Sequence, residues 1–227
     1  MAHGGKLLQI VRESHSSETL TQGFNETWKE MGQTAPTTIM LKAGETITKE
    51  ALRQLLQKEK PVAILIWDGS GAVTTLDMLA TEKASPSLVL VSGRQLGSQL
   101  KTISEAARNF TYITYPYRLP HSDKSFTRFI EPYKKDLKAN ETLDAILKSS
   151  FITTQLLTSA LIDMRGYYYR DNFFDAIGMM PDQKNYPLYE RLSFGPGQRY
   201  TSKGCYIVQL GPSSNNDIIK KSDWVIH

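Results

Sequence analysis

The sequence has few of the residues that usually carry metal, disulfide or membrane chemistry. It has a single cysteine, Cys205, among 227 residues, so no disulfide can form within the chain and a disulfide-stapled scaffold is excluded. One cysteine and four scattered histidines form no metal-binding motif. No apolar run approaches the roughly 20 residues that a membrane-spanning helix needs. We therefore expect no metal and no cofactor, and we expect Cys205, which lies in an apolar segment, to be a buried structural thiol.

The chain also lacks a strong excess of charge of either sign. Its formal net charge is +4, and 22% of its residues are charged. Nucleic-acid binding usually needs basic residues gathered on one face. The densest basic group, residues 134 to 138, has three lysines, and we interpret it as a solvated helix face. No nucleic-acid partner is expected.

The first residues do not resemble a secretion signal. Residues 1–5 have no charged stretch followed by an apolar one, and they are typical of an artificial leader. We expect the fold to begin at Lys6. With 40% apolar residues, the chain is long enough to bury a core without disulfides.

From Lys6 to about residue 120, short apolar runs alternate with amphipathic helical stretches. The predicted strands are 6–12, 37–42, 61–67, 87–93 and 110–117. The predicted helices between them are 20–31, 48–56, 71–79 and 96–107. This alternation favours right-handed crossovers, and thus a doubly wound, mostly parallel α/β sheet over residues 6–120.

The pattern changes at residues 118 to 125, which we take as a hinge or boundary. Beyond it the predicted helices are 126–137, 143–164 and 170–177. The predicted β segments are 188–194, 204–210 and 222–226. We therefore expect residues 121–227 to form a helical and β segment that returns to the first lobe.

A parallel sheet of this kind places its ligand site at the carboxyl ends of its strands, because the following loops and helix N-termini all converge there. Small, polar and aromatic residues follow several of the predicted strands. The candidate ligand-binding residues are Arg12, Ser14, Asp68, Gly69, Ser70, Ser92, Gly93, Tyr115 and Tyr117. Together they suit hydrogen bonding and stacking of a small zwitterion or acid.

Each candidate also has a structural explanation that the sequence leaves open. Ser14, Ser70 and Asp68 can cap helices, the glycines can serve turn geometry, and the tyrosines can pack at a sheet edge. Catalytic templates fit poorly, because no nucleophile elbow, dinucleotide-binding loop or phosphate-binding loop is present. His15 lies between two serines, but no orienting acid accompanies it. We predict a binding protein and not an enzyme.

Three stretches are similar to one known family. They are Thr21-Gln22-Gly23-Phe24 through Met31-Gly32, the strand segment Glu59 to Trp67, and Leu192 to Gly197 followed by Tyr206 to Leu210 and Ser222 to Trp224. These resemble the type I periplasmic solute-binding proteins of ABC transporters, in the branched-chain amino-acid class. The resemblance covers most of the chain and corresponds to the second lobe and the C-terminal part of such proteins.

The resemblance implies a function and several partners. It implies binding of a small polar ligand such as an amino acid, periplasmic or extracellular location, and association with transporter membrane subunits. By position, Ser14, Asp68, Ser70, Ser92 and Tyr115 would meet the ligand, and a hinge near Arg118 would close over it. The opening half of the family's first lobe has no counterpart here, which implies either that the chain is a fragment or that a homodimer or a partner chain completes it. An enzyme on the same fold, or an interaction domain that has lost its ligand, remains an alternative.

Overall fold

The computed structural model describes residues 5–82, 86–120, 132, 141–181, 188–194, 204–212 and 217–226. The chain divides into two compact units. The first consists of Met1–Tyr115 and Ile207–Asp223, and the second of Pro116–Tyr206 and Trp224–His227. Within the described residues, no helix is both long enough and apolar enough to cross a membrane.

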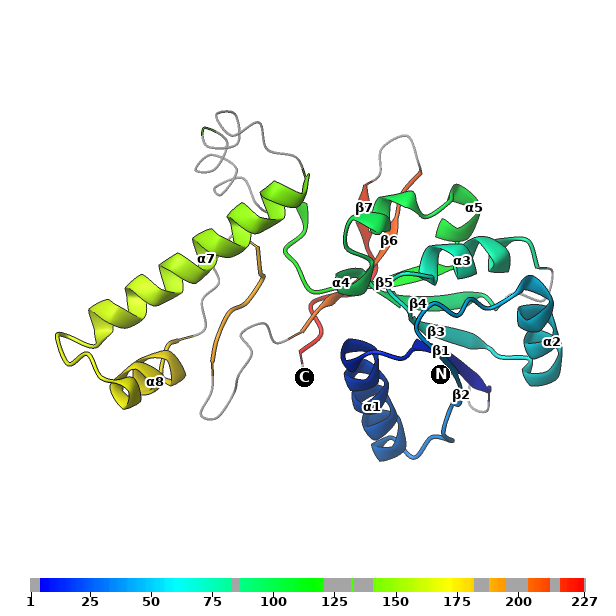
Figure 1. Cartoon of the computed structure of the whole chain (residues 1–227), viewed down its shortest axis with the longest axis horizontal. Coiled ribbons are helices and arrows are strands. Elements are labelled where there is room, and N and C mark those ends of the chain that lie inside the picture. Colours follow the sequence, from blue (N-terminus) through cyan, green and yellow to red (C-terminus); the bar gives the residue numbers. More distant parts are fainter. Residues whose placement is uncertain are drawn as a thin grey trace. The chain divides into compact units, whose positions relative to one another are not determined.

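Among the residues that the structure describes, seven strands form one sheet in the order β2-β1-β3-β4-β5-β6-β7 (Figure 1). The first five are β1 (Leu7–Arg12), β2 (Thr37–Leu41), β3 (Ala63–Trp67), β4 (Leu88–Ser92) and β5 (Thr111–Tyr115). All four pairings among these five are parallel. The chain order reverses at β1, which lies between β2 and β3, as in a doubly wound sheet. The predicted α/β fold class is confirmed.

Helices of the first unit cover both faces of this sheet (Figure 1). On one face, α1 (His15–Glu30) packs Leu20 and Phe24 against Val11, Leu65 and Trp67. Side chains alternate along a strand, so Ile10, Ile64 and Ile66 point to the other face. There the buried leucines of α2 (Lys49–Glu59) and α3 (Ala72–Ala80) complete the core. β3 is apolar on both faces because both are covered.

The single helix predicted at 96–107 is instead three short elements. They are α4 (Gly93–Leu96), the 3-10 helix η1 (Gly97–Thr102) and α5 (Glu105–Arg108). Gly97 interrupts the first helix with a φ of +53°, a conformation that favours glycine. The buried Arg108 side chain holds the break, because its guanidinium donates to the carbonyls of Lys101, Ile103 and Gly211.

The C-terminal β structure also differs from the prediction. The strand expected at 204–210 is β6 (Tyr206–Leu210), which follows β5 in the sheet order and pairs antiparallel with β7 (Ile218–Lys220). In place of a strand over 222–226 there is one isolated bridge, between Cys205 and Val225. In the segment 188–194 the structure has no strand, and Leu192 is buried against a helix. Leu192 therefore contributes to helix packing, and it also forms a β-bridge outside the named strands.

Two helices dominate the described part of the second unit (Figure 1). They are α7 (Glu141–Asp163) and α8 (Arg170–Gly178), which agree closely with the predicted spans. Ile152 and Leu192 form a small buried cluster, with Leu156, Leu188 and Tyr189 packed around it. The helix predicted at 126–137 lies outside the described residues.

Candidate functional site

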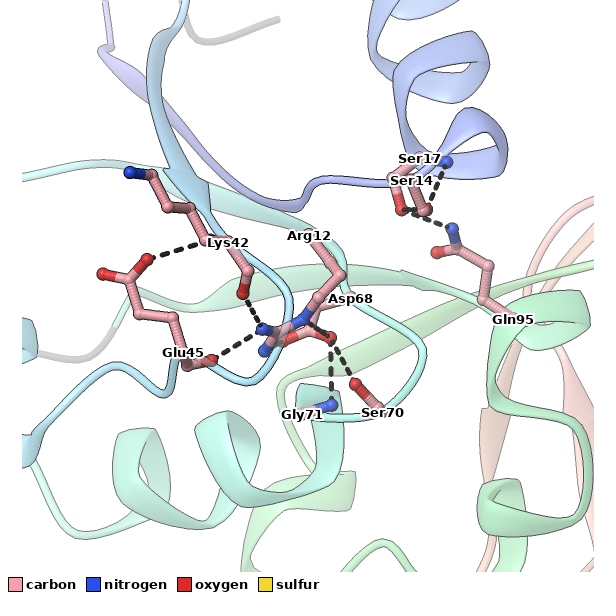
Figure 2. A network of polar contacts seen from close by, with 9 residues as sticks. All are labelled: Arg12, Ser14, Ser17, Lys42, Glu45, Asp68, Ser70, Gly71 and Gln95. Atoms are coloured by element: carbon pink, nitrogen blue, oxygen red, sulfur yellow. Dashed lines mark hydrogen bonds and ion pairs between the residues drawn. The ribbon is translucent and has the colours of Figure 1, made fainter.

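The carboxyl ends of β1, β3 and β4 lie next to one another, because these strands are parallel neighbours in the sheet. The loops and helices that follow them bring together most of the predicted site residues. Two networks of polar contacts occupy this edge (Figure 2). We call the contacts of Arg12 and Asp68 the hub, and those of Ser14, Ser17 and Gln95 the serine cluster.

The hub is a bidentate ion pair between the ends of β1 and β3. Arg12 Nε donates to Asp68 Oδ1 at 3.0 Å, and Nη2 donates to Oδ2 at 2.8 Å. Arg12 Nη1 donates to the carbonyl oxygens of Lys42 and Glu45, each at 2.6 Å. All three guanidinium nitrogens are therefore engaged, and the β2–α2 loop is tied to β1 and β3 (Figure 2).

The Asp68 carboxylate also starts α3. Its Oδ1 accepts from the backbone N–H of Gly71 at 3.0 Å and from the Ser70 hydroxyl at 3.2 Å. The Asp68 side chain is only 1% exposed, and that of Arg12 is 13% exposed. Burial alone would raise the pKa of Asp68, but hydrogen bonds from Arg12, Gly71 and Ser70 outweigh it, so that pKa is lowered. The hydrogen bond to Asp68 in turn raises the pKa of Arg12.

The serine cluster joins the loop after β1 to the helix after β4. Ser14 caps α1, because its hydroxyl accepts from the Ser17 backbone N–H at 3.3 Å, and it donates to the Ser17 hydroxyl at 2.9 Å. The Gln95 side-chain amide donates to the Ser17 hydroxyl at 3.0 Å and to that of Ser16 at 3.5 Å (Figure 2). Gln95 Oε1 is a buried acceptor with no hydrogen-bond partner in the described part of the chain. Ser92 caps α4 by accepting from the Gln95 backbone N–H at 3.4 Å.

Both predicted glycines allow close packing at this edge. A Cβ on Gly93 would lie 2.8 Å from the Thr114 carbonyl oxygen and 3.0 Å from Ile113 Cγ2. A Cβ on Gly69 would lie 2.9 Å from the Gln95 carbonyl oxygen. The absence of a side chain therefore lets the β3–α3 loop approach α4, and lets α4 approach β5.

The two tyrosines fall in different units. Tyr115 ends β5 in the first unit and is half-buried. Tyr117 belongs to the second unit, where its ring lies 6.0 Å from that of Tyr189. Nearby in the second unit, the Arg118 backbone N–H donates to the Leu188 carbonyl.

A small pocket of about 160 Å³ adjoins the hub. Its walls come from the β2–α2 loop, the start of α3 and the hub itself. The lining residues are Arg12, Gly44, Glu45, Thr46, Ile47, Asp68, Ser70, Gly71, Thr74, Thr75 and Met78. The predicted site residues do not include Ser16, Ser17, Glu45, Thr46 or Gln95. Glu45 and Gln95 lie no further beyond a predicted strand than Ser70 does, so distance from a strand end alone does not separate them.

Groups suited to metal binding or to nucleophilic catalysis are few in the part of the chain that the structure describes. No group of three or more His, Cys, Asp or Glu side chains is placed to hold a metal ion there. His15 is exposed, and no hydrogen bond among the described residues joins its imidazole to Ser14 or Ser16. Cys205 is half-buried and not fully buried as predicted, and burial raises the pKa of its thiol.

Comparison with known proteins adds information on the fold only. No protein-family model and no curated protein matches the sequence. Among solved structures, a branched-chain amino-acid ABC transporter protein from Thermus thermophilus with bound valine matches with a TM-score of 0.77 and 11% identity. The match covers 100% of this chain and 62% of that one.

Two further solved structures show the same architecture with other ligand classes in their names. A fatty acid ABC transporter substrate-binding protein from Thermomonospora curvata has a TM-score of 0.70 and 13% identity, over 100% of this chain and 59% of its own. A solute-binding protein of an ABC transporter from Rhodopseudomonas palustris BisB5, in complex with 3,4-dihydroxybenzoic acid, has a TM-score of 0.66 and 16% identity. That match covers 98% of this chain and 60% of that protein.

This chain therefore spans about three fifths of the length of the solved structures that it matches. The resemblance expected from the sequence is confirmed at the level of fold: the chain has the architecture of the substrate-binding proteins of ABC transporters.

Proposed function

We propose that this chain is a ligand-binding module of an ABC-type transport or sensing system, and that it binds a small polar ligand such as an amino acid. The observation that carries the proposal is the convergence of three strand ends at one edge of a parallel sheet. Ser16, Ser70 and Gln95 come from three different connections, yet all lie at this edge. Open α/β sheets bind their ligands there.

The exposure of these groups supports binding from solvent. Ser16 and Ser70 are exposed, and the start of α1 adds backbone N–H groups suited to a carboxylate. By contrast, Arg12 and Asp68 are engaged with each other. We infer that they shape the edge and that Ser16, Ser70 and Gln95 meet the ligand, with Ser14, Ser92, Gly69 and Gly93 setting the loops. We propose that Tyr115 and Tyr117 stack on the ligand.

We also propose how the chain divides into lobes, where it works and which partners it has. Residues 6–120 form the ligand-binding lobe, and residues 121–227 belong to an incomplete second lobe that returns to the first. The module works outside the cytoplasm, in the periplasm or at the cell exterior, delivers its ligand to transporter membrane subunits, and turns nothing over. The named ligands of the solved structures, valine and dihydroxybenzoate, support a small polar or acidic ligand class.

A thermal-shift screen tests this proposal. The protein is heated with each of the common amino acids, with small carboxylates and with small amides. A ligand at a hundred times its dissociation constant stabilises the fold by about 2.7 kcal/mol, which raises the melting temperature by about 5–10 °C in a protein of this size. A panel in which no compound moves the melting temperature would overturn the proposal.

Variants then locate the site. Ser16→Ala combined with Ser70→Ala should remove the shift, because both hydroxyls lie at the proposed edge. Thr81→Ala is the matched control, since that hydroxyl bonds the Met78 carbonyl at the far end of α3. A shift that survives the serine changes would place the site elsewhere, and NMR spectra showing conversion of the ligand would indicate an enzyme instead.

A further inference from the structure

Large apolar side chains are exposed where α7 turns into α8. Six of them are between 56% and 84% exposed. We call this set the hairpin tip: Ile162, Tyr167, Tyr168, Tyr169, Phe174 and Met179. Single exposed apolar residues are common on proteins, but here three consecutive tyrosines lie in the turn, with Ile162 in α7, Phe174 in α8 and Met179 just after it. Such a set is typical of a contact surface.

The hairpin tip is held in place by the backbone around it. Arg165 and Gly166 leave α7 with φ values of +50° and +92°, which turns the chain sharply. The Asn172 side-chain amide then donates to the Tyr167 carbonyl at 2.9 Å, tying α8 back to the turn. Because these contacts already order the backbone that carries the tyrosines, association would cost less conformational entropy than ordering a loop would.

Aromatic contacts fix part of the surface as well. The rings of Phe173 and Phe174 pack edge to face, with centroids 6.2 Å apart. The Arg170 guanidinium lies 5.4 Å from the centroid of the Phe174 ring. Tyrosine, phenylalanine, methionine and arginine are the residue types enriched in protein–protein interfaces.

Charges of both signs surround the hairpin tip. Two arginines, Arg165 and Arg170, and three aspartates, Asp163, Asp171 and Asp175, are all exposed. Within the described part of the chain, none of these five makes an ion pair. A partner of one charge sign, such as a nucleic acid or an acidic membrane, would meet repulsion from part of this rim. A second copy of the same rim offers an opposite charge for each sign.

We propose that the hairpin tip is the contact surface of a symmetric dimer of this chain. In a two-fold interface the same patch appears on both sides, so the patch must be complementary to itself. Here the tyrosines pack on one another at the centre, and the arginines of each copy face the aspartates of the other at the rim. This inference does not depend on the proposed ligand-binding function, because all of its residues lie in the second unit.

Sedimentation equilibrium of the whole chain over a range of concentrations tests the dimer. The predicted result is a mass that rises toward twice 25.6 kDa as concentration increases. Replacing both Tyr167 and Tyr168 by alanine should weaken the dimer by about 30-fold or more, as expected for central tyrosines. Met31→Ala is the matched control, because Met31 is 57% exposed in the first unit and should leave the mass unchanged.

Charge reversal distinguishes a dimer from an interface with a different protein. One variant carries Arg165→Asp with Arg170→Asp, and the other carries Asp163→Arg, Asp171→Arg and Asp175→Arg. Each alone should be monomeric, while their mixture should form a heterodimer, and circular dichroism confirms that each is folded. A wild-type chain that stays monomeric up to about 100 μM would overturn the proposal, as would tyrosine variants that dimerise like the wild type.

Discussion

The hub and the serine cluster share one edge of the sheet but differ in how fully their polar groups are used. In the hub, the buried Asp68 carboxylate accepts from Arg12, Ser70 and Gly71. In the serine cluster, Ser14 and Ser16 are exposed, and Gln95 Oε1 has no hydrogen-bond partner among the residues that the structure describes. The difference teaches that polar residues at strand ends can either be fully bonded to one another or keep unused hydrogen-bonding groups at the surface.

Truncating the hub should have the largest effect on stability. Asp68→Ala leaves the Arg12 charge without its partner, and Arg12→Ala leaves a buried carboxylate uncompensated. Each change should lower the free energy of unfolding by about 3–5 kcal/mol, measured by urea denaturation. The double variant should lose much less than the sum of the two, because the pair acts as a unit. Losses below about 1 kcal/mol, or strictly additive ones, would show that the hub does not hold the edge together.

Disrupting the close packing behind the serine cluster should have the next largest effect on stability. Gly93→Ala forces a methyl group against the Thr114 carbonyl and Ile113, and should cost about 1–3 kcal/mol. Gly23→Ala is the control, because a Cβ at that position in α1 meets nothing within 4 Å. That control should gain about 0.5–1 kcal/mol through better helix propensity. Equal effects at the two glycines in thermal unfolding would contradict the packing account.

Acidification should weaken the hub more gently than truncation. The folded-state pKa of Asp68 lies below its unfolded value of 3.8, so the contribution is complete above about pH 5 and is lost as pH falls through the folded value. One carboxylate changes the stability by at most about 1.4 kcal/mol per pH unit in that window. Comparing wild type with Asp68→Asn by urea denaturation isolates this group, because only the wild type should lose the stability that the ionised Asp68 carboxylate contributes. Identical pH profiles would contradict the assigned role.

The sequence predicted the sheet well, but it did not show which polar residues at the edge of the sheet bond one another. Strands such as Ala63–Trp67 were readable because burial on both faces leaves a continuous apolar run. The three short elements over 93–108 could not be predicted from the sequence. The interruption of the helix depends on the Gly97 conformation and on a hydrogen bond from Arg108 to a carbonyl far along the chain. Likewise, Arg12 and Asp68 were predicted as ligand contacts, and no local pattern shows that residues 56 positions apart bond each other.

The smallest stability effects should come from the serine cluster. Ser14→Ala removes a helix cap and should cost about 1 kcal/mol, with Thr153→Ala in α7 as a control that leaves every cap intact. Gln95→Ala should leave the melting temperature within a few degrees of wild type while weakening ligand binding about tenfold or more in calorimetry. A Gln95 variant that unfolds like the hub variants would remove the distinction between the two networks.

Chemical-shift mapping tests most directly whether the serine cluster edge is where ligand binds. A uniformly ¹⁵N-labelled chain is titrated with an equimolar mixture of the common L-amino acids, followed by the individual compounds. We predict saturable shifts of the backbone amides of Ser16, Ser70 and Gln95. No saturable change at any concentration, or changes confined to the groove that Glu18 and Gln22 of α1 form with Met40 of β2, would contradict the account.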